Sequence, residues 1–487
     1  MKAAMKVANV KMKMKMETIR LALLVVGMSV AAAAQSADQA PPSATPAPTP
    51  APAFGQNAPV LNPENPPVTG LDVPSLDLRV ASRSFFAPAF QVSESADTNG
   101  GNQLGAGTNG LESITRVLGA FDLQKFWPRT DAYLEYLGGG AFYSSPFDAR
   151  QMQAAAFEGV ERWRTGQATL RDSFSYLPDG SFQIGYGGDP GLGLITGGLG
   201  VGVPGTVPLN NGSAGSVGNI PRLANVAVFD VVQALNPRSA VTAAGGFSNA
   251  HFYDPTDTLI NSNEYTAEGG YSHLISRRDQ LGVVYAFQLF QFPQATGGEI
   301  YVHVVNLRWS HTISGRLSFI VGVGPQYTEL NLGNPPQTHL EPSGRAMLRY
   351  KLRSHGSLFA SYEKYISPGS GFFAGADTQM VRVGFTRRFQ RTWELFADVG
   401  YSHNKRLQES IFGATTATSY DEGSAGTVIR RHLGRSYDVF ATYRFLDMNF
   451  NEAPGFSPGL GVGNGTVAHR HIGTIGVEWH PRPTRID

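Results

Sequence analysis

Apolar and polar residues alternate along much of this chain, and the alternation is clearest over residues 381–402. In residues 393–401 every second residue is apolar, and the positions between them include Glu394, Asp398 and Gly400. Residues 381–385 alternate in the same way, with Arg382 between two valines. Successive side chains of a β-strand point to opposite faces of its sheet. Both runs therefore predict strands with one apolar face and one polar face.

The same period of two recurs in many further segments, most regularly after residue 225. Clear examples are residues 281–289, 305–309, 317–323, 346–352 and 437–445. Their apolar sets carry Trp or Tyr near the ends, whereas the opposite sets carry charged, hydroxyl and glycine residues. In a transmembrane β-barrel, lipid faces one side of each strand and the polar interior faces the other, with aromatic girdles at both interfaces. The pattern predicts an all-β chain that folds as a transmembrane antiparallel up-and-down β-barrel.

The connections between these segments alternate between short and long. Short turns are predicted at residues 236–238, 276–279, 313–315, 354–356 and 433–435. Longer linkers rich in Gly, Pro and Asn are predicted at residues 331–338, 368–377, 407–417 and 449–465. Outer-membrane barrels have short periplasmic turns and longer extracellular loops. We therefore predict about 18 strands, with both termini in the periplasm, and 16 strands as the alternative if the first hairpin is not in the wall.

Closure of the sheet is a second prediction. An unpaired backbone donor in hydrocarbon costs several kcal/mol, so an open sheet edge is not tolerated in the membrane. The last predicted strand, residues 473–479, must then pair with the first, which we place in residues 77–90.

Composition narrows the class further. The chain has 487 residues, of which 16% are charged, whereas soluble proteins average about 25%. No run of about 20 apolar residues exists after the N-terminal region, which argues against a helical membrane protein. A net charge of +1 argues against nucleic acid as a partner. The absence of cysteine excludes a disulfide scaffold, a thiol nucleophile and a thiolate metal site.

The N-terminal region predicts export. A Lys-rich stretch, a short apolar run over residues 21–30 and a small-residue cleavage site at residues 31–34 together describe a signal peptide, residues 1–34. Residues 35–75 are rich in Pro and Ala and are predicted to be a disordered periplasmic segment. The predicted barrel occupies residues 76–482, and it is interrupted by a Gly-rich loop at residues 179–221. That loop either folds into the lumen and narrows it or lies exposed on the surface.

Residues 85–102 read Phe-Phe-Ala-Pro-Ala-Phe-Gln-Val-Ser-Glu-Ser-Ala-Asp-Thr-Asn-Gly-Gly-Asn. This stretch resembles the opening segment of uncharacterised bacterial outer-membrane β-barrel proteins of porin-like type. The resemblance implies the barrel fold and the outer membrane of a Gram-negative-type bacterium. It brings no substrate and no catalytic residue. Outer-membrane lipids and the barrel-assembly machinery are the partners expected for such a chain.

The polar faces of the strands supply the candidate site. A barrel of 16–18 strands is wide enough for an aqueous channel, and rings of charged side chains set ion preference in pores. Basic and acidic walls could face each other across a constriction, or the charges could form a purely structural lattice of salt bridges. The predicted pore-lining residues are Arg308, Arg345, Arg349, Lys351, Glu363, Arg382, Glu394, Asp398, Arg430, Asp438 and Arg444. The predicted lipid-facing girdle consists of Tyr285, Trp309, Tyr350, Trp393, Tyr401, Tyr437, Tyr443 and Trp479.

The function predicted from these features is a porin-like channel for passive diffusion of small hydrophilic solutes or ions. The alternatives are a structural or adhesion barrel with a plugged lumen and, less favoured, an outer-membrane lipid or polysaccharide hydrolase. Catalytic signals are weak, because the G-x-S-x-G match around Ser457 lies in a loop without strand-turn-helix context. His469 and His471 could bind a metal only with a third ligand, and a plain pair near the rim is the favoured interpretation. We therefore predict no enzyme activity, no cofactor and no metal, and we leave a homo-oligomer open.

Overall fold

The computed structural model describes most of the chain from Ser84 onward. The chain divides into two units, residues 1–52 and 53–487, and every described residue belongs to the second. The predicted signal peptide, the Pro/Ala-rich segment and all of loop 179–221 but its last residue lie outside the described residues. The described ranges are 84–98, 111–144, 149–177, 221–253, 259–293, 298–331, 336–352, 356–369, 371–389, 392–407, 417–434, 436–451, 467–482 and 484–486.

These residues form 18 long strands and one strand of two residues. None of them belongs to a helix with the length and apolar character needed to cross a membrane. The strands are β1 (Phe85–Asp97), β2 (Glu112–Phe126), β3 (Thr130–Tyr143), β4 (Arg150–Trp163), β5 (Gly166–Leu177), β6 (Arg222–Asn236), β7 (Ser239–Phe252), β8 (Ser262–Leu274), β9 (Asp279–Phe292), β10 (Gly298–Ser314), β11 (Leu317–Asn331), β12 (Gln337–Lys351), β13 (Gly356–Ser367), β14 (Ala376–Phe389), β15 (Trp393–Arg406), β16 (Ser419–Leu433), β17 (Tyr437–Asn451), β18 (Val467–Trp479) and β19 (Thr484–Arg485).

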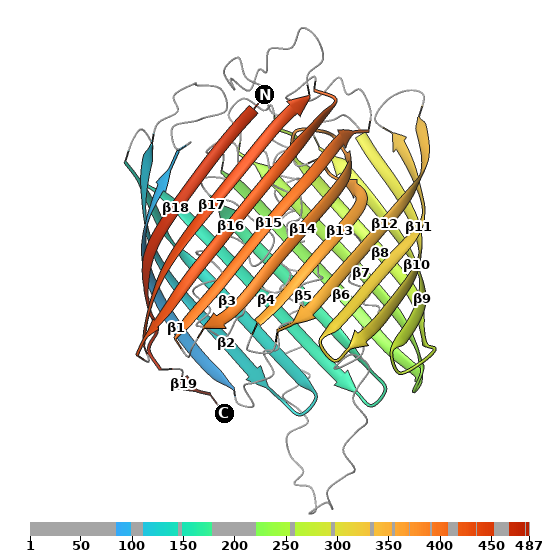
Figure 1. Ribbon diagram of the computed structural model, residues 1–487, viewed down its shortest axis with the longest axis horizontal. Coiled ribbons are helices and arrows are strands. Elements are labelled where there is room, and N and C mark those ends of the chain that lie inside the picture. Colours follow the sequence, from blue (N-terminus) through green and yellow to red (C-terminus); the bar gives the residue numbers. More distant parts are fainter. Residues whose placement is uncertain are drawn as a thin grey trace, which may run out of the picture. The chain divides into compact units, whose positions relative to one another are not determined.

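Each long strand pairs antiparallel with its neighbours in the sequence, and β1 pairs with β18 (Figure 1). The pairing of β1 with β18 runs from Phe90 opposite Trp479 to Asp97 opposite Ile472. The sheet is therefore closed, and the prediction of an antiparallel barrel of 18 strands is confirmed. The alternative of 16 strands is wrong, because β1 and β2 both belong to the wall.

The first strand lies further along the chain than expected. We predicted it in residues 77–90, whereas β1 covers Phe85–Asp97, and residues 77–83 lie outside the described residues. Pro88 sits within β1, opposite Phe121 of β2. On its other side, no described residue pairs with positions 87–89, because β18 ends its pairing at Phe90 and β19 pairs only with Phe85 and Phe86. Proline has no backbone N–H to donate, and Pro88 lies between the segment of β1 that pairs with β18 and the segment that pairs with β19.

The two faces of the strands differ as the alternation predicts. Along β9, Gln280, Val284 and Gln288 are buried on the inner face, whereas Val283 and Tyr285 on the outer face are exposed. Exposed apolar side chains cover the outer face of a closed sheet only where that face meets lipid rather than water. This arrangement is that of the transmembrane β-barrels of bacterial outer membranes.

Connection lengths also alternate around the ring. Turns of two to four residues join β4 to β5, β6 to β7, β8 to β9 and β10 to β11 at one end. Longer connections at the other end include residues 178–221, 368–375, 407–418 and 452–466. We refer to these two ends as the short-turn end and the long-loop end. The short strand β19 follows β18 at the short-turn end (Figure 1).

The closing seam between β1 and β18 holds a buried ion pair. The guanidinium of Arg470 donates through Nε to both carboxylate oxygens of Asp97 at 3.1 Å. Next to it, the hydroxyls of Ser95 and Thr474 are 2.9 Å apart, and Arg116 of β2 donates to Ser95 at 2.6 Å. Polar contacts between side chains therefore reinforce the backbone ladder where the two ends of the chain meet.

A charge placed on the outer face tests the lipid-facing assignment. Ile475 is 67% exposed on β18, four residues from Trp479. We expect Ile475→Arg to lower the free energy of unfolding by about 2–4 kcal/mol, as arginine does near the bilayer midplane. The measurement is equilibrium unfolding in urea from lipid vesicles.

His469→Arg is the matched control, since it changes the same face of the same strand near the long-loop end. There an arginine can retain the ion pair with Asp447. A loss equal to that of Ile475→Arg, or no loss in either variant, would contradict the assignment.

Candidate functional site

Charged side chains on the inner face of the barrel form ion pairs between nearby strands. Arg308 of β10 lies 3.8 Å from Glu268 of β8, and both are buried. Arg345 of β12 lies 3.5 Å from Glu363 of β13. The predicted basic and acidic residues of these strands therefore pair along the wall, between strands, rather than only facing each other across the lumen.

A second group of pairs continues around the wall. Arg382 of β14 lies 3.8 Å from Asp398 of β15, and the positive charge of Arg444 on β17 also acts on that carboxyl. The carboxylate is buried, and isolated charges are costly to bury in protein. Two nearby guanidinium groups offset part of that cost.

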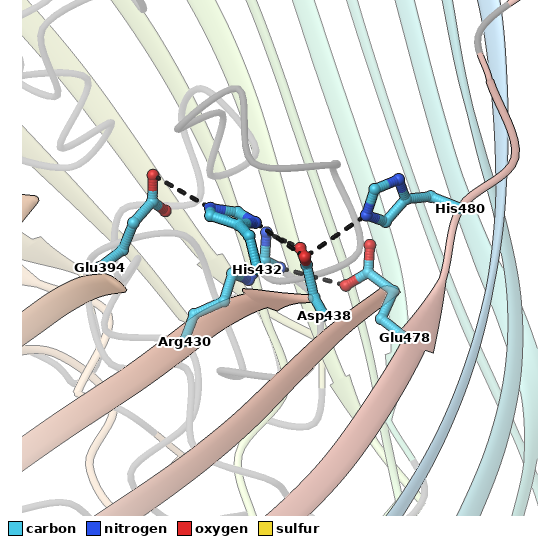
Figure 2. A network of polar contacts seen from close by, with 6 residues as sticks. All are labelled: Glu394, Arg430, His432, Asp438, Glu478 and His480. Carbon is cyan, nitrogen blue, oxygen red and sulfur yellow. Dashed lines mark hydrogen bonds and ion pairs between the residues drawn. The ribbon is translucent and has the colours of Figure 1, made fainter. Parts of the chain in front are cut away.

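The densest network lies near the short-turn end, where side chains of β15, β16, β17 and the end of β18 converge (Figure 2). Arg430 contacts Asp438 at 3.4 Å and Glu478 at 3.1 Å. His432 links Asp438, at 2.7 Å, to Glu394, at 3.6 Å. The negative carboxylates and the positive guanidinium compensate one another electrostatically. A lattice of salt bridges therefore links four neighbouring strands.

His480 completes this network from just beyond β18, with Nε2 3.4 Å from Asp438 (Figure 2). Of its six members, sequence reasoning named Glu394, Arg430 and Asp438 but missed His432, Glu478 and His480. The alternation could have found Glu478, because it falls between Val477 and Trp479 on the polar face. His480 follows the strand, so no periodic signal points to it.

Two predicted pore-lining residues lie where water reaches them. Arg349 is half-buried on the inner face of β12, where its guanidinium lies 3.7 Å from the sulfur of Met347. Lys351 is exposed at the last position of β12, on the rim of the short-turn end. The eleven predicted residues thus occupy inward-facing positions of β10 and β12–β17, from the rim to mid-wall.

Some inner polar groups have no partner among the described residues. Both carboxylate oxygens of Glu264 on β8 and both amide atoms of Gln288 on β9 are buried without a hydrogen bond there. The two residues are diagonal neighbours, because Glu264 lies opposite Phe290 in the ladder. Buried polar groups of native proteins are normally satisfied by protein or by ordered water. The polar inner face of the wall therefore extends to β8 and β9.

The connection between β13 and β14 folds into the lumen. We define the luminal hairpin as residues 365–369 and 371–376, all of which are buried. Its rings pack on one side of the barrel: Phe372 lies 5.5 Å from Tyr420 of β16 and 5.1 Å from Phe450 of β17, measured between ring centroids. Phe373 lies 5.5 Å from Tyr420. The hairpin is thus anchored to the wall by aromatic packing.

The luminal hairpin also meets the opposite side of the barrel. The backbone N–H of Ile260, just before β8, donates to the carbonyl of Gly371 at 2.9 Å. In a ring of 18 strands, β8 and β17 lie half-way around from each other. The hairpin therefore bridges opposite walls and narrows the lumen at the long-loop end.

Glycine makes this path possible. Gly375 has φ of +85°, and a Cβ there would lie 2.3 Å from Cδ1 of Ile300 on β10. Gly369 has φ of +83°, and its Cβ would collide with the carbonyl of Phe373. Glycine alone adopts such conformations freely and tolerates such close approach.

This placement corrects the expectation for residues 368–377. The sequence predicted a long extracellular loop there, whereas its described residues pack inside the barrel. The loop that was expected to narrow the lumen, residues 179–221, lies outside the described residues except for its last. The adjacent pair Phe372 and Phe373 within a Gly-rich stretch was the available signal, because paired aromatic residues are unusual in an exposed loop.

All eight residues of the predicted girdle are exposed on the outer face, at 37–51% of their full surface. Trp309, Tyr350, Trp393, Tyr437 and Trp479 lie near the short-turn ends of their strands, and Tyr285, Tyr401 and Tyr443 lie further along. Two of the residues nearer the long-loop end form hydrogen bonds with histidines: the hydroxyls of Tyr285 and Tyr443 lie 2.8 Å from Nδ1 of His303 and His471.

Among the described residues, the weak catalytic and metal signals do not gather into a site. Ser457 lies outside the described residues. His469 and His471 lie on the outer face of β18, each bonded to its own partner on β17, Asp447 and Tyr443. No group of three or more His, Asp or Glu side chains with the geometry to hold a metal ion occurs in the described ranges.

Comparison with known proteins adds a likeness in fold. No protein-family model and no curated protein matches the sequence. Among solved structures, the chain is similar to Pseudomonas aeruginosa OpdQ, with 10% identity, a TM-score of 0.39, and coverage of 83% of this chain and 100% of that one. It is similar to the outer membrane protein opdK from Pseudomonas aeruginosa, with 12% identity, a TM-score of 0.39, and coverage of 82% and 98%.

It is also similar to the ferric citrate transporter FecA, with 11% identity, a TM-score of 0.40, and coverage of 81% of this chain and 64% of that one. At such identities and TM-scores, no functional argument follows from these likenesses. The closed sheet and its exposed apolar face establish the chain as an outer-membrane type of β-barrel.

Proposed function

We propose that the protein is an outer-membrane channel for passive diffusion of small hydrophilic solutes or ions. One observation carries the proposal: a closed wall of 18 strands has charged and amide side chains on its inner face from the short-turn rim to mid-wall. Barrels of 16–18 strands leave room for an aqueous channel. Charged groups on such a wall are compatible with water-filled space and costly in a dry interior.

The narrow zone of this channel is the long-loop end, where the luminal hairpin bridges the walls. The short turns, the start of β1 and the end of β18 face the periplasm in this proposal, since outer-membrane barrels have short turns on that side. Solutes then pass the luminal hairpin first and the charged wall second. The proposed pore lining is the set of eleven predicted residues, extended by Glu268, Glu478 and His432.

Planar-bilayer recording of the refolded protein tests the proposal. We expect stepwise conductance, with a reversal potential that moves toward cation preference in Arg345→Glu and Arg349→Glu, because both changes place negative charge on the inner face. Arg431→Glu is the matched control, since Arg431 lies on the outer face against the ring of Trp393. Absence of stepwise conductance would refute a channel, and unchanged reversal potentials would remove Arg345 and Arg349 from its lining.

A second function is favoured by a specific observation. The luminal hairpin joins opposite walls, by buried aromatic packing on one side and a backbone hydrogen bond on the other, as expected for a structural or adhesion barrel with a plugged lumen. That barrel would be silent in bilayers and would act through its long loops. Ion flow through the unmodified protein separates the two functions.

The partners we propose follow from the outer face. The girdle contacts outer-membrane lipids, and the barrel-assembly machinery inserts the chain. Whether the barrel forms a homo-oligomer is measured by analytical ultracentrifugation in detergent.

A further inference from the structure

The neighbouring strands β12 and β13 are hydrogen-bonded to each other over only part of their length. Backbone pairing of β12 with β13 ends at Gly344 opposite Lys364. Beyond that point β12 stays paired with β11 as far as Gln337, and β13 stays paired with β14 as far as Ser367. No described strand pairs with the free edge of residues 337–343. The wall thus parts along a seam between β12 and β13 at the long-loop end.

Among the described residues, side chains alone span this seam. Nζ of Lys364 lies 2.9 Å from Glu341 of β12 and 3.4 Å from Asp377 of β14. Lys364 has the outward parity of Tyr362, whereas Glu341 shares the inner face of β12 with Arg345. The two can meet only because β13 has moved inside β12. The side chains of Lys364 and Glu341 are 17% and 40% exposed, and one such ion pair is far weaker than a run of backbone hydrogen bonds.

The seam begins where the apolar band of the outer face ends, on the side of the long-loop end. Tyr362, an exposed outer aromatic residue, lies opposite Ala346 just below the last backbone pair. Below it the ladder of β12 and β13 is complete, as hydrocarbon requires. Above it Leu340 is 74% exposed on the outer face beside Tyr327, and Pro342 carries no backbone donor. An apolar side chain therefore flanks the seam where acyl chains meet head groups.

Behind the seam lies an apolar interface. Ile366 has outward parity, yet it is buried in one cluster with Leu330, Ile300 and Val302, which are inner residues of β11 and β10. The luminal hairpin thus packs against the inner face of β10 and β11. Moving the hairpin away would expose apolar surface on both sides. Only a solute that binds such surface favours that open state, because a ligand shifts an equilibrium through its differential affinity.

We propose that the seam between β12 and β13 is a lateral passage, through which uncharged apolar small molecules move between the lumen and the outer leaflet. Lys364 acts as its latch through Glu341 and Asp377. The apolar lining, Ile366 and Leu330 among it, defines the solute class. The passage rests on the proposed location in the outer membrane but not on diffusion of hydrophilic solutes along the barrel axis.

The test uses the absence of cysteine from the chain. Cells whose outer leaflet is lipopolysaccharide express the protein with Glu341→Cys and Lys364→Cys, and uptake of the uncharged dye N-phenyl-1-naphthylamine is followed by fluorescence. We expect the protein to accelerate uptake over cells that lack it. Bridging the two cysteines with a short bismaleimide should return the rate to that of cells without the protein. N-ethylmaleimide, which alkylates without bridging, should not.

Ala346→Cys with Tyr362→Cys is the matched control, because this pair lies on the same two strands within their hydrogen-bonded region. Bridging it should leave dye uptake unchanged. Lys364→Gln supplies a second variant, which should raise the uptake rate by removing the latch. Uptake that is unaffected by bridging residues 341 and 364, or no acceleration by the unmodified protein, would overturn the proposal.

Bilayer conductance separates this proposal from the proposed function. The variant bridged at residues 341 and 364 should keep its axial ion conductance. A protein without conductance but with dye uptake that depends on the seam would refute the axial channel and retain the lateral passage. Conductance without dye uptake that depends on the seam would retain the axial channel and refute the lateral passage.

Discussion

Replacing Phe372 and Phe373 by alanine is expected to raise single-channel conductance several-fold. Both rings are buried against Tyr420, and Phe372 also packs on Phe450. A buried Phe→Ala change costs about 3–5 kcal/mol of packing free energy. The luminal hairpin would lose its hold on β16 and β17, and the narrow zone would widen. Planar-bilayer recording of the double variant beside the unmodified protein measures the change.

Phe157→Ala is the control, because Phe157 is an exposed outer-face ring of β4 and does not face the lumen. It should leave the conductance as it is. Equal conductance in the double variant and the unmodified protein would show that the hairpin does not limit flow. A silent unmodified protein with a conducting double variant would identify a plugged barrel.

Arg470→Met is expected to lower the free energy of unfolding by about 3–5 kcal/mol, the usual cost of removing one partner of a buried ion pair. Asp97 is 0% exposed and Arg470 is 2% exposed, so the carboxylate would be left buried in the closing seam without its guanidinium. The strands β1 and β18 meet only when the ring closes. The measurement is equilibrium unfolding in urea, with heat-dependent mobility in detergent gels as a second readout.

Arg162→Met is the matched control, since the ion pair of Arg162 with Asp131 is 35% and 22% exposed. A pair so accessible to water contributes about 0–1 kcal/mol. The double variant Asp97→Asn with Arg470→Met should recover part of the loss, because it removes the uncompensated charge. Equal losses for Arg470→Met and Arg162→Met would contradict the role of the buried pair.

The sequence by itself determined the two faces of the strands and a number of about 18, although it placed the first strand too early in the chain and left 16 strands open. Alternation is a local property: Val283 and Tyr285 face lipid and Gln288 faces inward because each strand turns successive side chains to opposite sides. Closure followed from the cost of unpaired backbone groups in hydrocarbon. The same period placed Arg308, Asp398 and Asp438 on the inner face.

Only the tertiary structure decided which groups meet. Arg470 pairs with Asp97 across 373 positions of sequence, because ring closure brings the first and last long strands together. The period gives Ile366 the outward parity of Tyr362, but β13 leaves the wall after Lys364 and turns that side chain onto β10 and β11. The luminal hairpin contacts both β17 and the residue before β8, which lie half-way around the ring from each other. Such contacts depend on the curvature of the closed sheet. The alternation along a single strand contains no information about that curvature.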